Sequence, residues 1–184
     1  MILKNLQKIL KTFLKKKKIY TGLNSKVFLI SEKKILKKFI RKRKEKYLKE
    51  IKCLKILSKE NFVPKLLEYN DKNFEITMTY CGENINSINL PKNWKRQIKK
   101  IQKVLNQQDF VQADIELHNI CVQNKKIFII DFGSNRFKDD PFFSDNFLQP
   151  SWLKKYKLDK EKKFEIYKKI KHNNLYKILA ELRG

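Results

Sequence analysis

Short β-prone runs crowd the first half of the sequence, and this arrangement constrains the fold more than any other feature. The runs are rich in apolar residues, and polar turn residues separate them. Four strands are expected, over residues 26–30, 33–39, 65–69 and 74–79. A charged helix over roughly residues 42–57 lies between the two pairs. This order predicts a β-rich region that carries one helix.

The character of the chain changes after residue 81. Two helices are expected, over residues 91–108 and about 159–182, and one further hairpin, over 120–123 and 127–130. Asn124-Lys125 is the expected turn of this hairpin. We therefore predict an α+β protein in which residues 1–81 form a β-rich lobe and residues 82–184 form a reduced, mostly helical lobe.

Positive charge dominates the composition. The 184 residues include 44 Lys or Arg and 19 Asp or Glu, which gives a formal net charge of +25. Residues 1–55 alone carry 20 cations against three glutamates, a net charge of +17. Such a field attracts phosphate-rich partners, namely nucleotides, RNA or an anionic membrane surface. An AT-rich genome also enriches Lys, Asn and Ile, so the charge alone selects no partner.

The N-terminal residues predict an amphipathic basic helix. Apolar residues between Ile2 and Leu14 recur at helical spacing, with lysines between them. Such a helix either packs on the domain or binds a membrane surface or a partner. No apolar run is long enough for a transmembrane segment, and no signal-peptide pattern is present. Three widely spaced cysteines in apolar surroundings predict buried thiols, and we expect a cytoplasmic protein that is peripheral if its basic region binds a membrane.

The most specific signal is a set of oxygen-bearing side chains in the second half. Asn119 follows five residues after Asp114, and Asp131-Phe132-Gly133 comes directly behind the second strand of the expected hairpin. Phosphoryl transfer needs a carboxylate that orients and deprotonates the acceptor hydroxyl, and it needs oxygen ligands for Mg²⁺. These residues can supply both, and a strand fixes a metal ligand more firmly than a loose loop does.

At this spacing the sequence resembles the protein-kinase superfamily, whose catalytic loop carries Asp and Asn five residues apart and whose Asp-Phe-Gly follows a short hairpin. The resemblance implies a two-lobed fold with Asp114 as the catalytic base and with Asn119 and Asp131 as Mg²⁺ ligands. It also implies transfer of the γ-phosphoryl group of ATP to a hydroxyl on a protein, a glycan or a small molecule. The short second half, without Ala-Pro-Glu, favours abbreviated relatives: the RIO-like kinases, the lipopolysaccharide-core sugar kinases and the small kinase-like proteins of large DNA viruses.

The first half supplies a matching pair of charges. Glu50 lies on the apolar face of the expected helix, in a segment that resembles the Glu-Ile-x-x-Leu of kinases. A carboxylate in apolar surroundings needs a partner. Lys37 on the second strand is the expected partner, and the pair would hold this lysine against the α- and β-phosphates. Lys38 remains the alternative, because the sequence does not fix the register of the strand.

The rest of the implied nucleotide site comes from two segments. The resemblance places a phosphate-covering loop at residues 20–27, although one glycine stands where kinases have three. The contacts expected there are Gly22, Asn24, Ser25 and Val27. Residues 76–81 resemble the strand that leads to the interlobe linker, with Met78 in the gatekeeper position and the backbone around Tyr80 facing adenine. A simple buried strand is the alternative for this segment.

Two residues depart from the family pattern. Gln112 stands where most kinases have the histidine of His-Arg-Asp, and Glu116 stands where protein kinases carry a lysine that neutralises the γ-phosphate. A carboxylate there repels the transferring group, although His118 or one of the many other cations could compensate. These departures leave a second hypothesis open. In it the chain is a pseudokinase, a binding or scaffolding module that docks on nucleic acid or an anionic membrane through its basic face.

Overall fold

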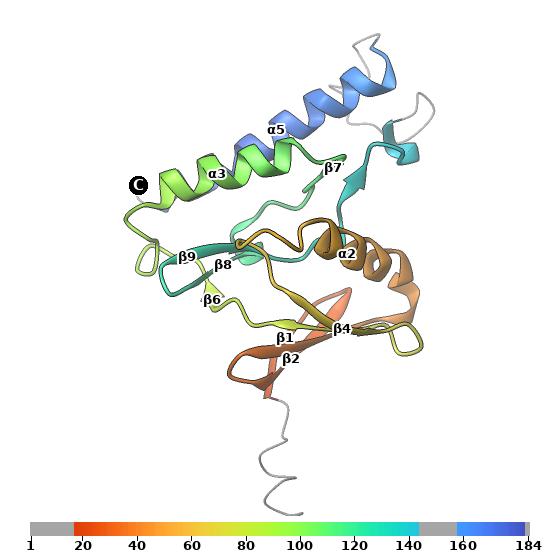
Figure 1. Ribbon diagram of the computed structural model, residues 1–184, viewed down its shortest axis with the longest axis vertical. Coiled ribbons are helices and arrows are strands. Elements are labelled where there is room, and N and C mark those ends of the chain that lie inside the picture. The colour runs from red at the N-terminus through yellow and green to blue at the C-terminus, as the bar shows by residue number, and fades with distance from the viewer. Residues whose placement is uncertain (1–16, 144–157, 183–184) are drawn as a thin grey trace, which may run out of the picture. The chain divides into compact units, whose positions relative to one another are not determined.

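A computed structural model describes residues 17–143 and 158–182 (Figure 1). The basic helix expected over residues 2–14 lies outside the described residues. Within them the chain divides into two compact units. The first comprises the chain up to Glu60 together with Pro64–Cys81, and the second comprises Asn61–Val63 and the chain from Gly82 onward. The protein is thus α+β, with a β-rich N-terminal region, as the sequence predicts.

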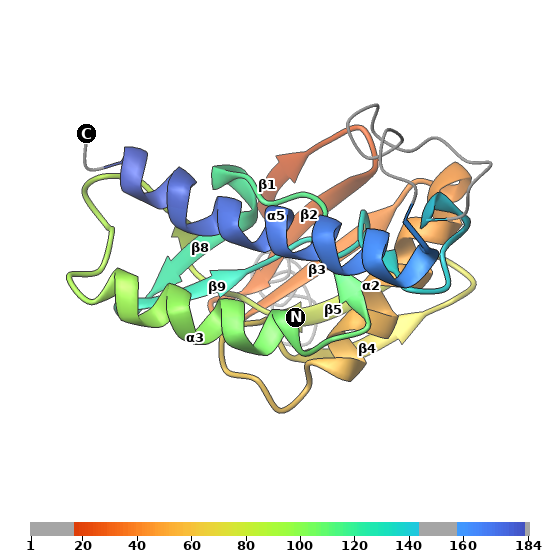
Figure 2. The ribbon, with the colours of Figure 1, turned by 90° about the horizontal axis from the view of Figure 1, so that it is seen from above.

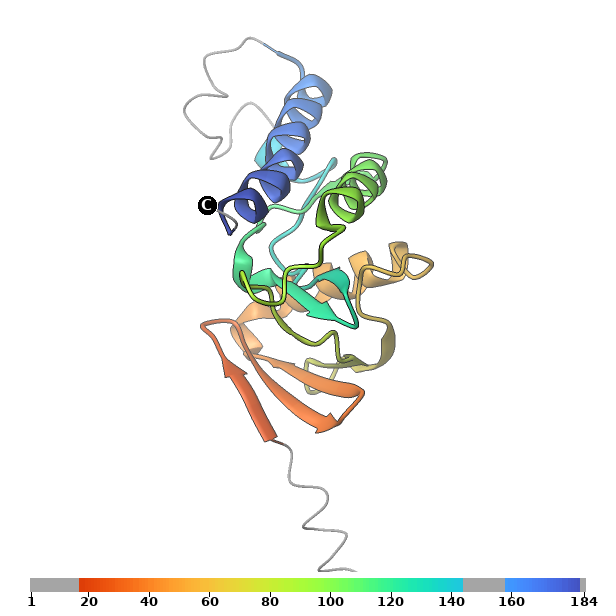
Figure 3. The same cartoon turned by 90° about the vertical axis from the view of Figure 1, so that its left-hand side faces the viewer.

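The first unit is built on a five-stranded antiparallel sheet with the order β1-β2-β3-β5-β4. The strands are β1 (Lys17–Thr21), β2 (Ser25–Ser31), β3 (Lys34–Phe39), β4 (Leu66–Asn70) and β5 (Glu75–Thr79). The four predicted strands are confirmed, and β1, seen beside β2 in Figure 3, was not predicted. Its lysine-rich sequence shows no clear alternation, and an edge strand tolerates such charge because only one side of it is paired.

One helix packs on this sheet. The short 3₁₀ helix η1 (Arg41–Arg43) leads into α2 (Lys44–Ile56), which confirms the predicted charged helix. Its buried face carries Tyr47, Glu50, Ile51, Cys53 and Leu54. The Tyr47 ring meets Phe39 and Phe74 edge to face, at centroid distances of 5.7 and 5.5 Å. Its hydroxyl donates a 2.7 Å hydrogen bond to Asp71 Oδ1, so one aromatic side chain joins the helix to the end of β3 and to the β4–β5 turn.

Two long helices lie side by side in the second unit (Figure 2). They are α3 (Trp94–Asn106) and α5 (Lys160–Glu181), and both were predicted. The Trp94 ring packs against the Tyr176 ring at 5.2 Å, and Gln102 Nε2 donates to the His172 carbonyl at 2.8 Å. Asp159 caps α5 by accepting a hydrogen bond from the Lys162 N–H.

Small sheets complete the second unit. The predicted hairpin is confirmed as β8 (Ile120–Gln123) and β9 (Lys126–Ile129). Asn124 and Lys125 turn it with φ values of 51° and 61°, which is typical of a type I′ turn. Three two-residue strands were not predicted, because so short a run carries no periodicity: β6 (Glu83–Asn84), which pairs with β8, and β7 (Phe110–Val111) and β10 (Arg136–Phe137), which pair with each other.

Two further expectations concern the cysteines and the possibility of a membrane-spanning helix. Cys53, Cys81 and Cys121 are buried thiols that form no disulfide, as predicted. Burial raises the pKa of the Cys121 thiol to about 11. Among the helices of the described ranges, none combines the length and apolar character needed to span a bilayer.

Candidate active site

Lys37 and Glu50 form a buried ion pair in the first unit. Lys37 Nζ donates to Glu50 Oε2 at 2.6 Å, and the two side chains are 7% and 1% exposed. The Lys37 ammonium also lies over the Phe39 ring, 4.9 Å from its centroid. The predicted partnership is therefore confirmed, and a strand and a helix each contribute one charge to it.

The register of β3 explains why Lys37, and not Lys38, meets Glu50. β3 is the central strand, and Lys37 is paired across it with Val27 of β2 and Ile76 of β5. Successive side chains of a strand point to opposite faces, so Lys38 turns away from the helix. Lys38 Nζ instead donates to Glu75 Oε1 at 2.9 Å on an exposed face. The alternative that the sequence left open is thus decided.

The segment predicted to cover phosphates is a tight hairpin turn. Gly22 N donates to Ser25 O at 3.0 Å across the β1–β2 turn, and Ile40 N donates to Asn24 O at 3.0 Å. Ser25 is buried at the start of β2, and Val27 is partly buried beside Lys37. The three atoms nearest to a Cβ at Gly22 all belong to the Tyr20 side chain, which would have to shift, so the backbone here does not by itself require glycine.

Met78 and Tyr80 occupy the strand that the resemblance linked to adenine. Met78 is buried in β5, where it pairs with Ile35 and Leu66. Tyr80 N already donates to Lys33 O at 2.9 Å, and the N–H of Thr79 already donates to Lys65 O at 3.0 Å. These two backbone donors are engaged within the sheet. Tyr80 could donate its N–H to a base only by losing this bond.

Hydrogen bonds in the second unit join Asn119 to Asp114 and to Ile130, the residue before Asp131. Asn119 Nδ2 donates to the Asp114 carbonyl at 3.0 Å, and the Asn119 carbonyl accepts from Ile130 N at 2.9 Å. The 3₁₀ helix η2 (Leu117–Asn119) makes the intervening turn. Asn119 is buried, whereas Asp114 is partly exposed. Because its nitrogen faces Asp114, the amide of Asn119 turns its oxygen the other way.

Asp131 has an uncommon backbone conformation. Its φ of 59° lies in the left-handed region, which residues other than glycine seldom adopt, and Asp is among the few that tolerate it. Gly133 N lies 3.4 Å from Asp131 Oδ1. Unusual backbone conformations concentrate at functional sites. The carboxylate of Asp131 and the amide oxygen of Asn119 are oxygen donors of the kind that Mg²⁺ takes alongside phosphate oxygens and water, so the donor chemistry of these two residues fits the implied ion.

A series of hydrogen bonds between uncharged groups supports the backbone of Asp131. It was not predicted from the sequence. Gln112 Nε2 donates to the Asp131 carbonyl at 3.2 Å, and Gln112 N donates to His172 Nε2 at 3.1 Å. His172 Nδ1 lies 2.7 Å from Asn106 Oδ1. Gln112, one of the two departures from the kinase pattern, therefore ties the segment that precedes Asp114 to Asp131.

One sequence feature could have indicated these hydrogen bonds, namely the position of His172 on α5. It lies on the buried stripe of the helix, with Phe164, Lys168, Leu175 and Leu179. A polar ring on an apolar stripe needs hydrogen-bond partners. Burial and, to a lesser extent, the charge of Lys168 lower the pKa of His172 to about 4, so the ring is neutral near pH 7.

Glu116 and His118 lie on the outer side of the loop. Their side chains are 64% and 57% exposed, and His118 Nδ1 is 3.5 Å from Glu116 Oε2. Asn84 Nδ2 donates to the His118 carbonyl at 2.7 Å and anchors this part of the loop. The carboxylate that departs from the family pattern thus has a histidine beside it, as the sequence analysis considered.

Comparison with known proteins adds no family assignment. No protein-family model matches the sequence, and no curated protein is similar enough to count as a match. Within residues 17–143 and 158–182, no three His, Cys, Asp or Glu side chains gather into a metal-binding group. The residues considered for Mg²⁺, Asp131 and Asn119, supply one carboxylate and one amide, so they do not form a group of three such ligands.

Proposed function

We propose that this protein is a phosphotransferase that uses ATP and Mg²⁺ to phosphorylate a hydroxyl group, and that its two units correspond to the nucleotide-binding and catalytic lobes of a reduced protein-kinase-like fold. The acceptor belongs to a protein, a glycan or another small molecule. The proposal rests on residues of both units, each described above on its own.

The buried Lys37–Glu50 pair carries the proposal. An ion pair in an apolar core seldom stabilises a protein more than apolar side chains of the same size would, because both charges lose their hydration. The pair nevertheless occurs between the strand and the helix where the resemblance expects it, with 2.6 Å between Nζ and Oε2. A function that needs a positioned ammonium group accounts for its presence better than stability does.

Each residue then has a defined task. Lys37, oriented by Glu50, would bind the α- and β-phosphates. Asp114 would orient the acceptor hydroxyl and take up its proton as the acceptor oxygen bonds to the γ-phosphorus, while the bond from that phosphorus to the bridging oxygen breaks and ADP leaves. Asn119 and Asp131 would hold Mg²⁺. When bound, this ion neutralises charge on the phosphates.

The hydrogen bonds of the second unit would keep these groups in place. The Asn119 amide fixes the loop at the Asp114 carbonyl, and Gln112 fixes the carbonyl of Asp131. A reacting group that is held in position needs little rearrangement during the reaction. On this proposal Gln112 takes over the supporting task that kinases give to a histidine.

The decisive experiment is transfer of radiolabelled γ-phosphate to protein, RNA and glycan pools, with autophosphorylation measured in parallel. Asp131→Asn removes the charge while asparagine still tolerates a positive φ, so the backbone conformation is kept. We expect this variant and Asp114→Asn to lose at least about a hundredfold in rate, the order of a general acid–base contribution. Asp139→Asn is the matched control, because Asp139 is exposed and outside the network. Equal transfer by all four proteins would refute the proposal.

A pseudokinase is the second candidate, and Glu116 favours it. Its exposed carboxylate stands where an active protein kinase would place a cation. Such a protein would bind a nucleotide or a partner, for instance through its basic N-terminal region, without transferring phosphate. A rise in thermal midpoint with ATP and Mg²⁺, lost in Lys37→Met and accompanied by no transfer, would identify this function. Glu116→Lys would then be the variant with which to seek restored transfer.

A further inference from the structure

The exposed side of α3 and the neighbouring β8–β9 turn form a surface of unusual charge. We call it the α3 basic face, and it consists of Lys92, Lys95, Arg96, Lys99, Lys100, Lys103, Lys125 and Lys126. All eight side chains are exposed, and none forms an ion pair with another residue of the ranges 17–143 and 158–182. No acidic residue occurs from residue 84 to residue 108.

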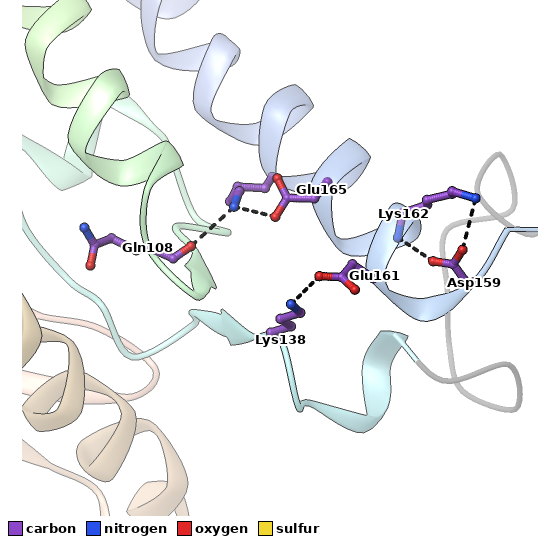
Figure 4. A network of polar contacts seen from close by, with 7 residues as sticks. Gln108, Lys138, Asp159, Glu161, Lys162 and Glu165 are labelled. Carbon is purple, nitrogen blue, oxygen red and sulfur yellow. Dashed lines mark hydrogen bonds and ion pairs between the residues drawn. The ribbon is translucent and has the colours of Figure 1, made fainter.

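The adjacent helix α5 shows that this pattern is not general to the unit. There Lys168 pairs with Glu165 at 2.6 Å, Lys162 lies 3.3 Å from Asp159, and Lys138 of the preceding segment pairs with Glu161 (Figure 4). These three cations are thus offset by local carboxylates. The cations of the α3 basic face have no such carboxylate partner among the described residues and face solvent, where they can neutralise an external anion.

The β8–β9 turn is fixed against α3 by a single side chain. Gln97 Nε2 donates to the Lys125 carbonyl at 2.9 Å, and Gln97 Oε1 accepts from Ile127 N at 2.9 Å. These bonds place the two turn lysines beside the helix. A helix of 13 residues is about 20 Å long at 1.5 Å per residue, so the face presents a straight row of cations.

The exposed positive charges of the face indicate an anionic partner. From these observations we propose that the α3 basic face binds the phosphate backbone of a double-stranded nucleic acid. A row of cations matches the regular charge of a duplex backbone. The face itself exposes no large apolar side chain: Trp94, Ile98, Ile101 and Leu105 point into the unit.

That lack of exposed apolar groups argues against the other anionic polymers and surfaces. A membrane-surface helix inserts apolar side chains among the lipid headgroups. A single-strand binder stacks bases on exposed aromatic rings. The eight residues of the face include no aromatic one, and Trp94, the aromatic residue of α3, is 2% exposed; Tyr176, which is 41% exposed, belongs to α5. Backbone contact to a duplex needs only placed cations, and it reads no sequence.

Fluorescence anisotropy with a labelled duplex of about 20 base pairs, titrated into the full chain at several salt concentrations, tests the proposal. The triple variant Lys95→Gln, Lys99→Gln, Lys103→Gln removes one row of the face. Each phosphate contact contributes about 0.9 to the slope of log K against log salt, so we expect the slope to fall by about 2 to 3 and the affinity at 0.1 M salt to fall at least about tenfold.

Two controls separate this surface from the overall charge and from catalysis. The variant Lys33→Gln, Lys34→Gln, Lys72→Gln removes the same charge from exposed positions of the first unit and should change the slope by less than about 0.5. Asp131→Asn should bind the duplex as the natural chain does, whether or not phosphate transfer is found. Equal losses in the two triple variants would overturn the proposal. So would tighter binding of the α3 basic face to a single strand of the same length, or to vesicles containing 30% phosphatidylserine.

Discussion

The two units hold their candidate residues by different physical means. In the first unit, Lys37 is kept in place by an opposite charge, the buried carboxylate of Glu50. In the second, Asp131 is supported through Gln112 and His172, whose side chains are neutral. The first arrangement fails if either charge is removed. The second fails if a charge is added, because a protonated imidazole could no longer accept a hydrogen bond.

This difference matches the task proposed for each unit. An ammonium group that binds phosphates must stay charged, and a buried carboxylate keeps it charged and oriented. The backbone at Asp131, the proposed Mg²⁺ ligand, must be held in place without an added charge. A positively charged group near it would compete with the metal ion. Neutral amide and imidazole groups supply that position.

Removing one charge of the buried pair is expected to have the largest effect. Lys37→Met leaves the Glu50 carboxylate in the core without its lysine, and such a change costs about 3 to 5 kcal/mol of unfolding free energy. Urea denaturation followed by tryptophan fluorescence and circular dichroism measures the loss. Lys38→Met, one residue along the same strand, should cost less than about 1 kcal/mol, because that lysine is 52% exposed.

The double variant Lys37→Met, Glu50→Leu sharpens the same comparison. Apolar residues of similar volume often replace a buried ion pair without loss of stability. We expect most of the stability to return, while nucleotide binding stays absent. A double variant as unstable as Lys37→Met would show that packing, and not the loss of the lysine charge beside Glu50, sets the cost.

Acid should weaken the second unit through His172. Its pKa is about 4 in the folded chain, against an ordinary value of about 6.5. Between these values the unfolded chain binds more protons, so stability is complete above pH 6.5 and falls as the pH drops toward 4. The contribution lost between pH 7.5 and pH 4.5 is about 2 to 3 kcal/mol.

Histidine variants isolate this contribution from the carboxylates that titrate over the same range. The chain has two histidines, and the other one, His118, is exposed. Urea denaturation at both pH values should show a smaller fall for His172→Gln than for the natural chain, while His118→Gln keeps the full fall. If all three proteins lost the same stability, the imidazole would not be the acid-sensitive element of the unit.

Much of this arrangement could be predicted from sequence, because periodicity and turn chemistry act locally. The strands β2 to β5, the helices α2, α3 and α5 and the β8–β9 hairpin all follow from such signals. The Lys37–Glu50 pair could be predicted because Glu50 lies on an apolar helical face, which requires a cation within reach.

The support behind Asp131 could not be predicted in the same way. Gln112 and His172 are 60 residues apart, and their hydrogen bond depends on how α5 packs in the second unit. Strands of two residues, such as β7 and β10, form because neighbouring segments bring their backbones together, which no local pattern encodes. Sequence therefore located the charged groups better than the neutral hydrogen bonds that position them.

The smallest expected effect comes from an ion pair of the second unit that looks similar to Lys37–Glu50 in length. Lys168 Nζ and Glu165 Oε1 are also 2.6 Å apart, but Glu165 is 53% exposed (Figure 4). Water therefore still solvates the carboxylate, and Glu165→Gln should cost no more than about 1 kcal/mol in urea denaturation. Lys168 keeps the Gln108 carbonyl at 3.4 Å and the Phe164 ring at 5.0 Å as partners. A cost near that of Lys37→Met would mean that separation of the charged atoms, and not burial of both, governs the strength of these pairs.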